Sequence, residues 1–174
     1  YPSNIFMLWS SSELEAIGIY EIVIDNSNLK DKKYYMNTQQ SFNFASGTVT
    51  ASYGTATAKP LDDVLWEDGD SDIPAGKSVG DVKTSGIRQG HIDAINAQAA
   101  GNLSPTDWMV VRAAEGGTAV PSSITTKRAA VRTKANAMCT QITNAANVDA
   151  LAALYVYNDD TPPVRPLGQL PQVD

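Results

Sequence analysis

The sequence predicts an α+β fold, in which a small antiparallel β-meander precedes a helical module and a proline-rich extended tail. Residues 34–59 are rich in threonine, aromatic and β-branched residues, which favour strands. Residues 85–157 carry apolar residues at helical spacing. Strands followed by helices, without alternation between them, are typical of α+β proteins and not of parallel α/β sheets.

The composition fits a folded chain that binds neither nucleic acid nor membrane. Of the 174 residues, 43% are hydrophobic and 18% are charged, a balance typical of globular proteins. The net charge of −6 disfavours nucleic-acid binding, which needs a basic face to neutralise phosphates. The apolar runs are all shorter than the roughly 20 residues of a membrane-spanning helix.

Changes in composition divide the chain into four segments. We expect an antiparallel β-rich domain over residues 1–59, a linker-like acidic loop over 60–84, a helical module of three to four helices over 85–157, and an extended proline-rich arm over 158–174. The second segment is interpreted as a linker because its prolines and glycines interrupt any periodicity.

Short elements are predicted at the start of the β-rich domain. The weak alternation of residues 5–9 predicts a strand. Ser12 and Glu15 match a capping box, which predicts the start of a brief helix that Gly18 ends. Residues 19–24 are β-branched and aromatic and predict a second strand.

A β-hairpin is predicted in the middle of the β-rich domain. Phe42 and Phe44 share one face of a strand, and Val49 and Ala51 share one face of the next. Ser46–Gly47 lies between them as the turn, where the glycine is available for a positive φ. We expect an antiparallel meander that is half exposed.

The acidic loop carries four carboxylates close together in sequence. They are Glu67, Asp68, Asp70 and Asp72. Alternating carboxylates can ligate Ca²⁺, which takes roughly six to eight oxygen ligands. The pattern lacks the Asp-x-Asp-x-Asp-Gly loop with its distal glutamate. A solvated acidic loop is therefore the preferred interpretation, and a structural ion is the alternative.

The sequence indicates no catalytic or cofactor site. The single cysteine, Cys139, follows Met138 in a predicted helix, where a small buried hydrophobic residue is the expected role. The single histidine, His91, lies near Asp93, but no serine, cysteine or metal-binding residue marks a partner for it. We therefore expect no cofactor, no metal and no enzymatic activity.

The first two helices of the helical module are predicted from their ends. Ser85 is expected to cap the first helix, which runs to Ala100 and stops at Gly101. Ser104 is expected to cap the second helix. Pro105 then occupies its first position, where the missing N–H has no cost.

The second helix ends at Gly116–Gly117 and is too short to be stable alone in water. Trp108 and Val111 share one of its faces at a spacing of three residues. We therefore expect this face to be docked on another element, with Trp108 as the apolar pin of a helical hairpin.

A third helix is predicted from residue 122 or 123 to Ala145, and a fourth from Asn147 to about Tyr157. Asn147 caps the fourth helix, which buries Leu151 and Leu154. The third helix presents one apolar stripe at helical spacing, made of Ile124, Val131, Ala135, Met138 and Ile142.

Charged residues are expected to lock the hairpin of the second and third helices. Arg112 and Glu115 are three residues apart and predict a surface ion pair. Arg128 lies at the edge of the third helix's apolar stripe and is expected to pair with Asp107 or Glu115. Structure is the preferred interpretation of these charges, because no nucleophile or metal constellation accompanies them.

The proline-rich arm would be extended. Leu167 and Leu170 provide it with apolar side chains that could be buried against a neighbouring subunit. A loose tail is the commoner role of such a segment, and an inter-subunit arm is the more specific interpretation.

The run LSPTDWMVVRAAEGGTAVPSSITTKRAAVRTKANAM, residues 103–138, resembles the short C-terminal module of tailed-bacteriophage tail-fibre proteins and tail assembly chaperones. The shared features are an Asp-Trp pair at a helix start, a proline before the next helix (Pro121), and an Arg-x-x-x-Arg pair on that helix. Other runs, such as SFNFASGTVTASYGTATAKPLDD, resemble proteins encoded among phage tail genes. The resemblance implies a non-enzymatic role, with Asp107, Trp108, Arg112, Arg128 and Arg132 as scaffold residues.

We therefore expect a bacteriophage virion structural protein of the tail, baseplate or fibre apparatus. Its expected partners are other phage tail proteins and copies of itself, as a homo-oligomer within the virion, after synthesis in the host cytoplasm. The alternative is a tail-fibre or tail assembly chaperone absent from the mature virion. A sugar-binding or hydrolytic β domain is less favoured, because Trp9, Tyr53 and Trp66 are scattered. The expected structural and interaction residues are Asp107, Trp108, Arg112, Glu115, Arg128, Arg132, Leu167 and Leu170.

Overall fold

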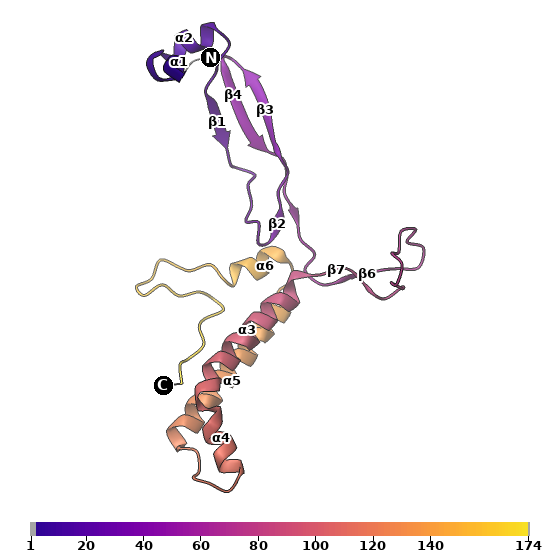
Figure 1. Cartoon of the computed structure of the whole chain (residues 1–174), viewed down its shortest axis with the longest axis vertical. Helices are drawn as coiled ribbons and strands as arrows, with labels where there is room; N and C mark the ends of the chain where they lie inside the picture. The colour runs from indigo at the N-terminus through magenta and orange to yellow at the C-terminus, as the bar shows by residue number, and fades with distance from the viewer. Residues whose placement is uncertain (1–2, 174) are drawn as a thin grey trace. The chain divides into compact units, whose positions relative to one another are not determined.

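The computed structural model describes residues 3–173. Strands occupy the N-terminal part of the chain and the long helices the C-terminal part, so the predicted α+β class is confirmed (Figure 1). The chain divides into two compact units, one ending at Ala58 and the other beginning at Lys59. The first unit holds a three-stranded sheet, and the second holds the long helices.

The first unit opens with two short helices, α1 (Ser3–Leu8) and α2 (Ser11–Ala16). The strand predicted over residues 5–9 is therefore wrong. Met7 and Leu8 belong to strongly helix-forming types, and so short an apolar run has no decisive periodicity.

A capping box starts α2, but it is made by Ser10 and Glu13 and not by Ser12 and Glu15. The Ser10 N–H donates to Glu13 Oε2 at 2.8 Å, and the Glu13 N–H donates to the Ser10 hydroxyl at 3.4 Å. The backbone bond and the Ser10 hydroxyl both hold the pKa of the Glu13 carboxyl below its usual value, the hydroxyl more strongly.

The sheet contains β1 (Ile22–Asp25), β4 (Thr48–Tyr53) and β3 (Gln40–Ala45), in that spatial order. The predicted hairpin of β3 and β4 is confirmed, with φ of 50° and 78° at Ser46 and Gly47. β1 lies parallel to β4, so the sheet is mixed where we expected a meander; the long connection after β1 permits this. β2 (Tyr35–Met36) and β5 (Thr57–Ala58) form a separate antiparallel pair.

Both faces of the three-stranded sheet carry exposed apolar side chains. Phe42 is 63% exposed, and Phe44, Ile22, Val23 and Ile24 are also more than half exposed. Tyr20 covers one side of Phe44, with 4.6 Å between the ring centroids. In the described residues of these strands, Ala51 is the one buried hydrophobic residue. The sheet therefore has little core of its own.

The second unit begins with an antiparallel pair, β6 (Val64–Leu65) and β7 (Val82–Thr84). This pairing corrects the expectation that residues 60–84 are only a linker. The base of the hairpin is fixed to the next helix, because the Ile87 N–H donates to the Pro60 carbonyl at 3.0 Å. Gly86 lies so close that a Cβ there would be 2.3 Å from the Asp62 carbonyl carbon, which explains the glycine.

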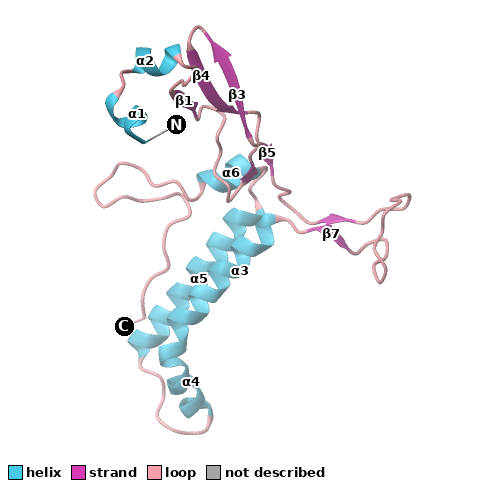
Figure 2. Ribbon diagram, turned by 45° about the horizontal axis from the view of Figure 1, so that its top comes forward, coloured by secondary structure: helices cyan, strands magenta, loops and turns pink. Residues whose placement is uncertain are grey.

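Two long helices, α3 (Ile87–Leu103) and α5 (Ser122–Thr143), lie side by side in the second unit (Figures 1 and 2). The cap of α3 is Gly86 and not the predicted Ser85, and α3 continues through Gly101 to Leu103. Gly101 costs a helix about 1 kcal/mol relative to alanine. Packing against α5 offsets that cost.

A 3₁₀ turn, Ser104–Thr106, leads from α3 into α4 (Asp107–Ala114). Ser104 is therefore not the N-cap of the second helix, and its hydroxyl donates back to the Gly101 carbonyl at 3.1 Å. The predicted end of this helix is confirmed, because Gly116 has a φ of 83°.

The core of the second unit lies between α3 and α5. The apolar stripe predicted on α5 is confirmed from Val131 onwards, while Ile124 is only half buried. Ile95 of α3 faces the same core and is almost fully buried. The fully buried side chains of α5 are Val131, Met138 and Ile142.

α6 (Val148–Ala153) is capped as predicted, because Asn147 Oδ1 accepts the Ala150 N–H at 2.8 Å. It ends before the predicted Tyr157. The segment that follows returns along α5, and the Leu167 N–H donates to the Leu154 carbonyl at 3.0 Å (Figure 1).

The tail is packed within its own unit, which corrects the expectation of an arm whose leucines are buried against a neighbouring subunit. Leu167 is 0% exposed, and Val173 is also buried. Leu170 is half buried. A side chain as deeply buried as Leu167 is not available to another subunit in this conformation.

Candidate functional site

Arg128 is the centre of a buried polar network at the far end of the α3–α5 hairpin. One Nη atom donates to the Leu103 carbonyl at 2.8 Å and to the Thr106 hydroxyl at 2.6 Å. The other Nη atom forms an ion pair with Asp107 Oδ1 at 2.7 Å. The predicted pairing of Arg128 with Asp107 is confirmed. Arg128 is 9% exposed, so its guanidinium satisfies groups that have little access to water.

The 3₁₀ turn explains how one guanidinium reaches three partners. It places the Leu103 carbonyl, the Thr106 hydroxyl and the Asp107 carboxylate within five consecutive residues. The fork of donors on an arginine side chain suits such a group of acceptors, whereas the point charge of lysine does not. The network therefore fixes the angle at which α4 leaves α3.

The ion pair predicted between Arg112 and Glu115 does not form. Arg112 lies over the Trp108 ring instead, with its guanidinium carbon 4.8 Å from the ring centroid. Its Nε atom is buried without a hydrogen-bond partner in the described part of the chain. Gly117 packs on the Arg112 side chain, since a Cβ at this position would lie 2.8 Å from Arg112 Cγ. Glu115 remains exposed.

Trp108 is not buried between α4 and α5 as we had expected. It is 54% exposed, and Val110 and Val111 of the same helix are exposed as well. None of the described residues of α4 is buried. The apolar face of α4 that we expected to be docked is therefore open to solvent, which is typical of a surface that meets a partner.

Replacing Trp108 with alanine is expected to change the free energy of unfolding by less than about 1 kcal/mol. The reason is that an exposed cation–π contact contributes about 0.5–1 kcal/mol. Urea unfolding followed by circular dichroism measures the change. A loss of several kcal/mol would show that the tryptophan is packed in solution.

A pocket of about 270 Å³ lies between α4 and α5, lined by Val110, Val120, Thr125, Arg128 and Arg132. Its walls are mainly apolar, and two guanidinium groups border it. Arg128 is already paired, whereas Arg132 has no ion pair in the described part of the chain. Arg132 is thus a cation beside an apolar hollow. Such a pair suits an apolar partner segment that carries an acid.

Arg88 holds the other end of the hairpin, and the sequence did not single it out. One Nη atom donates to the carbonyls of Ile142 and Thr143 at 2.6 and 2.5 Å, and the other to Ala145 at 3.1 Å. Arg88 also pairs with Asp62. These carbonyls lie at or just beyond the C-terminal end of α5, where helix carbonyls run out of intrahelical donors, and the Ile142 carbonyl also accepts the Ala145 N–H at 3.2 Å. The sequence signal that could have revealed it is that Arg88 is the single basic residue of a helix whose other charged side chain is Asp93.

Asp62 gives the second unit a pH dependence. The hydrogen bond from Arg88, assisted by its charge, holds the pKa of the Asp62 carboxyl below its usual value. The stabilisation is present above the unfolded-state pKa of about 4 and is lost as the pH falls through the lower folded-state value. When the pH is lowered from about 5 to about 2, the melting temperature of the Asp62→Asn protein is expected to fall by less than that of the wild type.

Thermal unfolding followed by circular dichroism in this range tests the role of Asp62. Asp68→Asn is the matched control, because Asp68 accepts no hydrogen bond from the residues that the structure describes. Equal acid sensitivity of the Asp62 and Asp68 variants would contradict the role assigned to Asp62.

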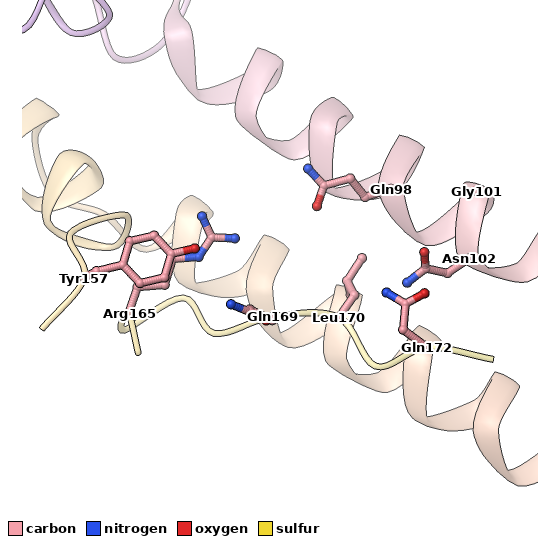
Figure 3. A pocket seen from close by; sticks show the side chains of 8 residues that line it. All are labelled: Gln98, Gly101, Asn102, Tyr157, Arg165, Gln169, Leu170 and Gln172. Atoms are coloured by element: carbon pink, nitrogen blue, oxygen red, sulfur yellow. The ribbon is translucent and has the colours of Figure 1, made fainter. Parts of the chain in front are cut away.

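A second pocket, of about 410 Å³, lies between α3 and the returning tail (Figure 3). Four carboxamides line it: Gln98 and Asn102 from α3, and Gln169 and Gln172 from the tail. Tyr157, with Arg165 5.5 Å from its ring centroid, lies at one end. The four-residue spacing of Gln98 and Asn102 on one helix face could have revealed this site.

The pocket offers hydrogen bonding and not proton transfer. Carboxamides both donate and accept, and none of the eight lining residues, all in the described part of the chain, has a carboxylate. Asn102 Nδ2 already donates to the Pro171 carbonyl at 3.0 Å, which ties the tail to α3. Leu170 points toward α3 from the tail (Figure 3). The site therefore suits a neutral polar ligand, or water molecules that bridge α3 and the tail.

The single histidine and cysteine lie in the second unit and are not paired with each other. His91 is buried, with Nδ1 2.7 Å from the Tyr155 hydroxyl. Cys139 is half buried, and burial raises the pKa of its thiol. Among residues 3–173, no group of three or more His, Cys, Asp or Glu side chains is placed to hold a metal ion.

Comparisons with family models, with curated proteins and with solved structures found no match to this chain. Within residues 3–173, none of the helices has the length and apolar character needed to cross a bilayer.

Proposed function

We propose that this chain is a structural protein of a tailed-bacteriophage virion, in the tail, baseplate or fibre apparatus, that works in several copies through protein–protein contacts. The observation that carries the proposal is the amount of apolar surface that each unit leaves open. A structural protein that is completed by its neighbours needs such surface. The resemblance of residues 103–138 to phage tail modules supports the same role.

The sheet of the first unit illustrates this surface. Its edge strands, β1 and β3, each have one side without a partner strand in the described chain. An edge of this kind can pair with a strand of another chain. More than half-exposed side chains at Ile22, Ile24 and Phe42 flank these edges. A partner that adds a strand would cover both the backbone groups and the apolar side chains.

The open helix α4 provides a second contact surface. Arg128 holds it rigidly on the α3–α5 hairpin, so its exposed face has a fixed orientation. A fixed surface binds a partner at a lower entropic cost than a flexible one. Asp107 and Arg128 then act as scaffold residues, and Trp108 and Arg132 are contact residues.

Quantitative peptide mass spectrometry on gradient-purified particles, beside the lysate of infected cells, tests the proposal. The expected result is a stoichiometric amount of the chain in the particles of the phage that encodes it, relative to a known tail protein. Abundance in the lysate with absence from particles would overturn the structural role. That outcome would favour an assembly chaperone, which needs the same open surfaces before assembly.

A further inference from the structure

Charge is divided between the two ends of the second unit. Residues 59–84, which we call the acidic hairpin, carry seven acidic and three basic side chains. Residues 104–134, which we call the basic tip, carry five basic and two acidic side chains. The acidic hairpin comprises β6, β7 and the loop between them, and the basic tip comprises α4 and the first half of α5. The chain as a whole has a net charge of −6, so the basic tip is a local reversal.

Several charges in both regions have no ion-pair partner in the part of the chain that the structure describes. In the acidic hairpin they include Glu67, Asp68 and Asp72, whereas Asp70 pairs with Lys83 at 2.9 Å. In the basic tip they include Arg112 and Arg132, whereas Arg128 pairs with Asp107. Each region therefore has charges free to pair with an opposite charge brought by another molecule.

Apolar side chains accompany the charges in both regions. Val64, Leu65 and Val79 are exposed in the acidic hairpin, and Trp108 and Val111 are exposed in the basic tip. Exposed apolar groups beside unpaired charges are typical of protein–protein interfaces. The buried apolar area contributes affinity, and the complementary charges fix how the two surfaces align. The hollow beside Arg132 adds a concave feature to the basic tip.

The two regions cannot meet within one chain. Asp62 and Pro60, at the base of the acidic hairpin, are fixed to the start of α3, and the loop points away from the helices (Figures 1 and 2). The basic tip begins after the other end of α3. A helix of 17 residues is about 25 Å long, so about this distance separates the base of the acidic hairpin from the start of α4. Arg132 is ten residues, or about 15 Å, from Ile142, which Arg88 holds at the start of α3. Complementary surfaces at opposite ends of one rigid element can be joined only between copies.

We propose that the acidic hairpin of one copy docks on the basic tip of the next copy. Such a contact joins two different surfaces and is head-to-tail, so it propagates into a ring or a filament unless it is capped. The contact specifies how the copies proposed above would assemble, and it rests on that proposal only for its place in a phage particle. The purified chain is expected to self-associate through these surfaces whether or not it belongs to a phage particle.

Charge reversal tests the proposed contact on the full chain. The tip variant combines Arg112→Glu with Arg132→Glu, and the loop variant combines Glu67→Lys with Asp72→Lys. Sedimentation velocity over a range of protein concentrations measures association. The wild type is expected to associate, and more weakly at about 0.5 M salt than at low salt. Each variant alone is expected to lose at least about tenfold in association constant, because like charges then face each other.

Mixing the two variants is the decisive step. In the mixture, the unchanged acidic hairpin of the tip variant meets the unchanged basic tip of the loop variant, and the two reversed surfaces match each other. Equimolar mixing is therefore expected to restore association to near the wild-type level. A variant with Glu15→Lys and Glu21→Lys, in the other unit, is the control and should associate like the wild type.

Three results would overturn the contact: a wild-type chain that stays monomeric at low salt, variants that associate as strongly as the wild type, or a mixture of folded variants that stays dissociated. Circular dichroism establishes folding. If the Arg112 change prevents folding, Arg132→Glu and Asp72→Lys alone carry the same test. Presence of the chain in particles is measured separately. A chain that is in particles but monomeric in solution would overturn this contact and leave the structural role intact.

Discussion

Replacing Leu167 with alanine is expected to destabilise the second unit by about 2–5 kcal/mol, the range for truncating a fully buried leucine. The side chain has no exposed surface, and its backbone N–H is bonded to the Leu154 carbonyl that follows α6. The truncation therefore removes fully buried methyl groups and leaves a cavity in the core.

Urea unfolding followed at 222 nm, where the signal of α3 and α5 dominates, measures the effect. Val164→Ala is the matched control, because Val164 lies in the same tail and is exposed. It should change the free energy of unfolding by less than about 0.5 kcal/mol. Equal effects of the two substitutions would show that the tail is detached in solution. In that case residues 161–174 would again be a candidate inter-subunit arm.

Replacing Arg128 with methionine is expected to cost about 2–4 kcal/mol of stability. Methionine has a similar reach but donates no hydrogen bond. The Thr106 hydroxyl then loses its donor, and the Leu103 carbonyl keeps only the bond from Thr106 at 2.9 Å, in a site with little water. Each unsatisfied buried group costs about 1–3 kcal/mol. Asp107 contributes less, because its side chain is half exposed and remains solvated without its partner.

Two further substitutions separate the parts of the Arg128 network. Asp107→Asn removes only the ion pair and should cost about 1 kcal/mol or less. Arg132→Met, one turn further along α5 and exposed, should leave stability within about 0.5 kcal/mol. If Asp107→Asn were as harmful as Arg128→Met, the ion pair and not the satisfaction of the buried acceptors would hold α4 in place.

Sequence reasoning predicted those features of the second unit that local chemistry determines. The apolar stripe of α5, the Asn147 cap and the glycine end of α4 depend on residue type and spacing, and all are present. The Arg128–Asp107 pair was predictable because Arg128 lies at the edge of a buried stripe. The long arginine side chain can then bury its apolar stem and extend its guanidinium along the helix surface to an acidic partner.

Features that depend on tertiary contacts were not predictable in this way. α3 continues through Gly101 because α5 supports it, and helix propensity gives no sign of that support. Leu167 is buried because the tail turns back at the end of α6, which no local pattern encodes. For Trp108 the sequence predicted burial that the structure does not show. Its spacing with Val111 indicated an apolar face packed on another element, but no element of the described chain covers it.

The burial of the tail has a consequence for the order in which the two units form during translation. The first unit ends at Ala58, so it can fold while the rest of the chain is still being made. The second unit needs Leu167 and Val173 to complete its core, and these residues are translated after all of its helices. A nascent chain stalled before them would have α3 and α5 but would lack the buried side chains that the tail adds to this core. Chaperone binding is therefore expected to be strongest in that interval.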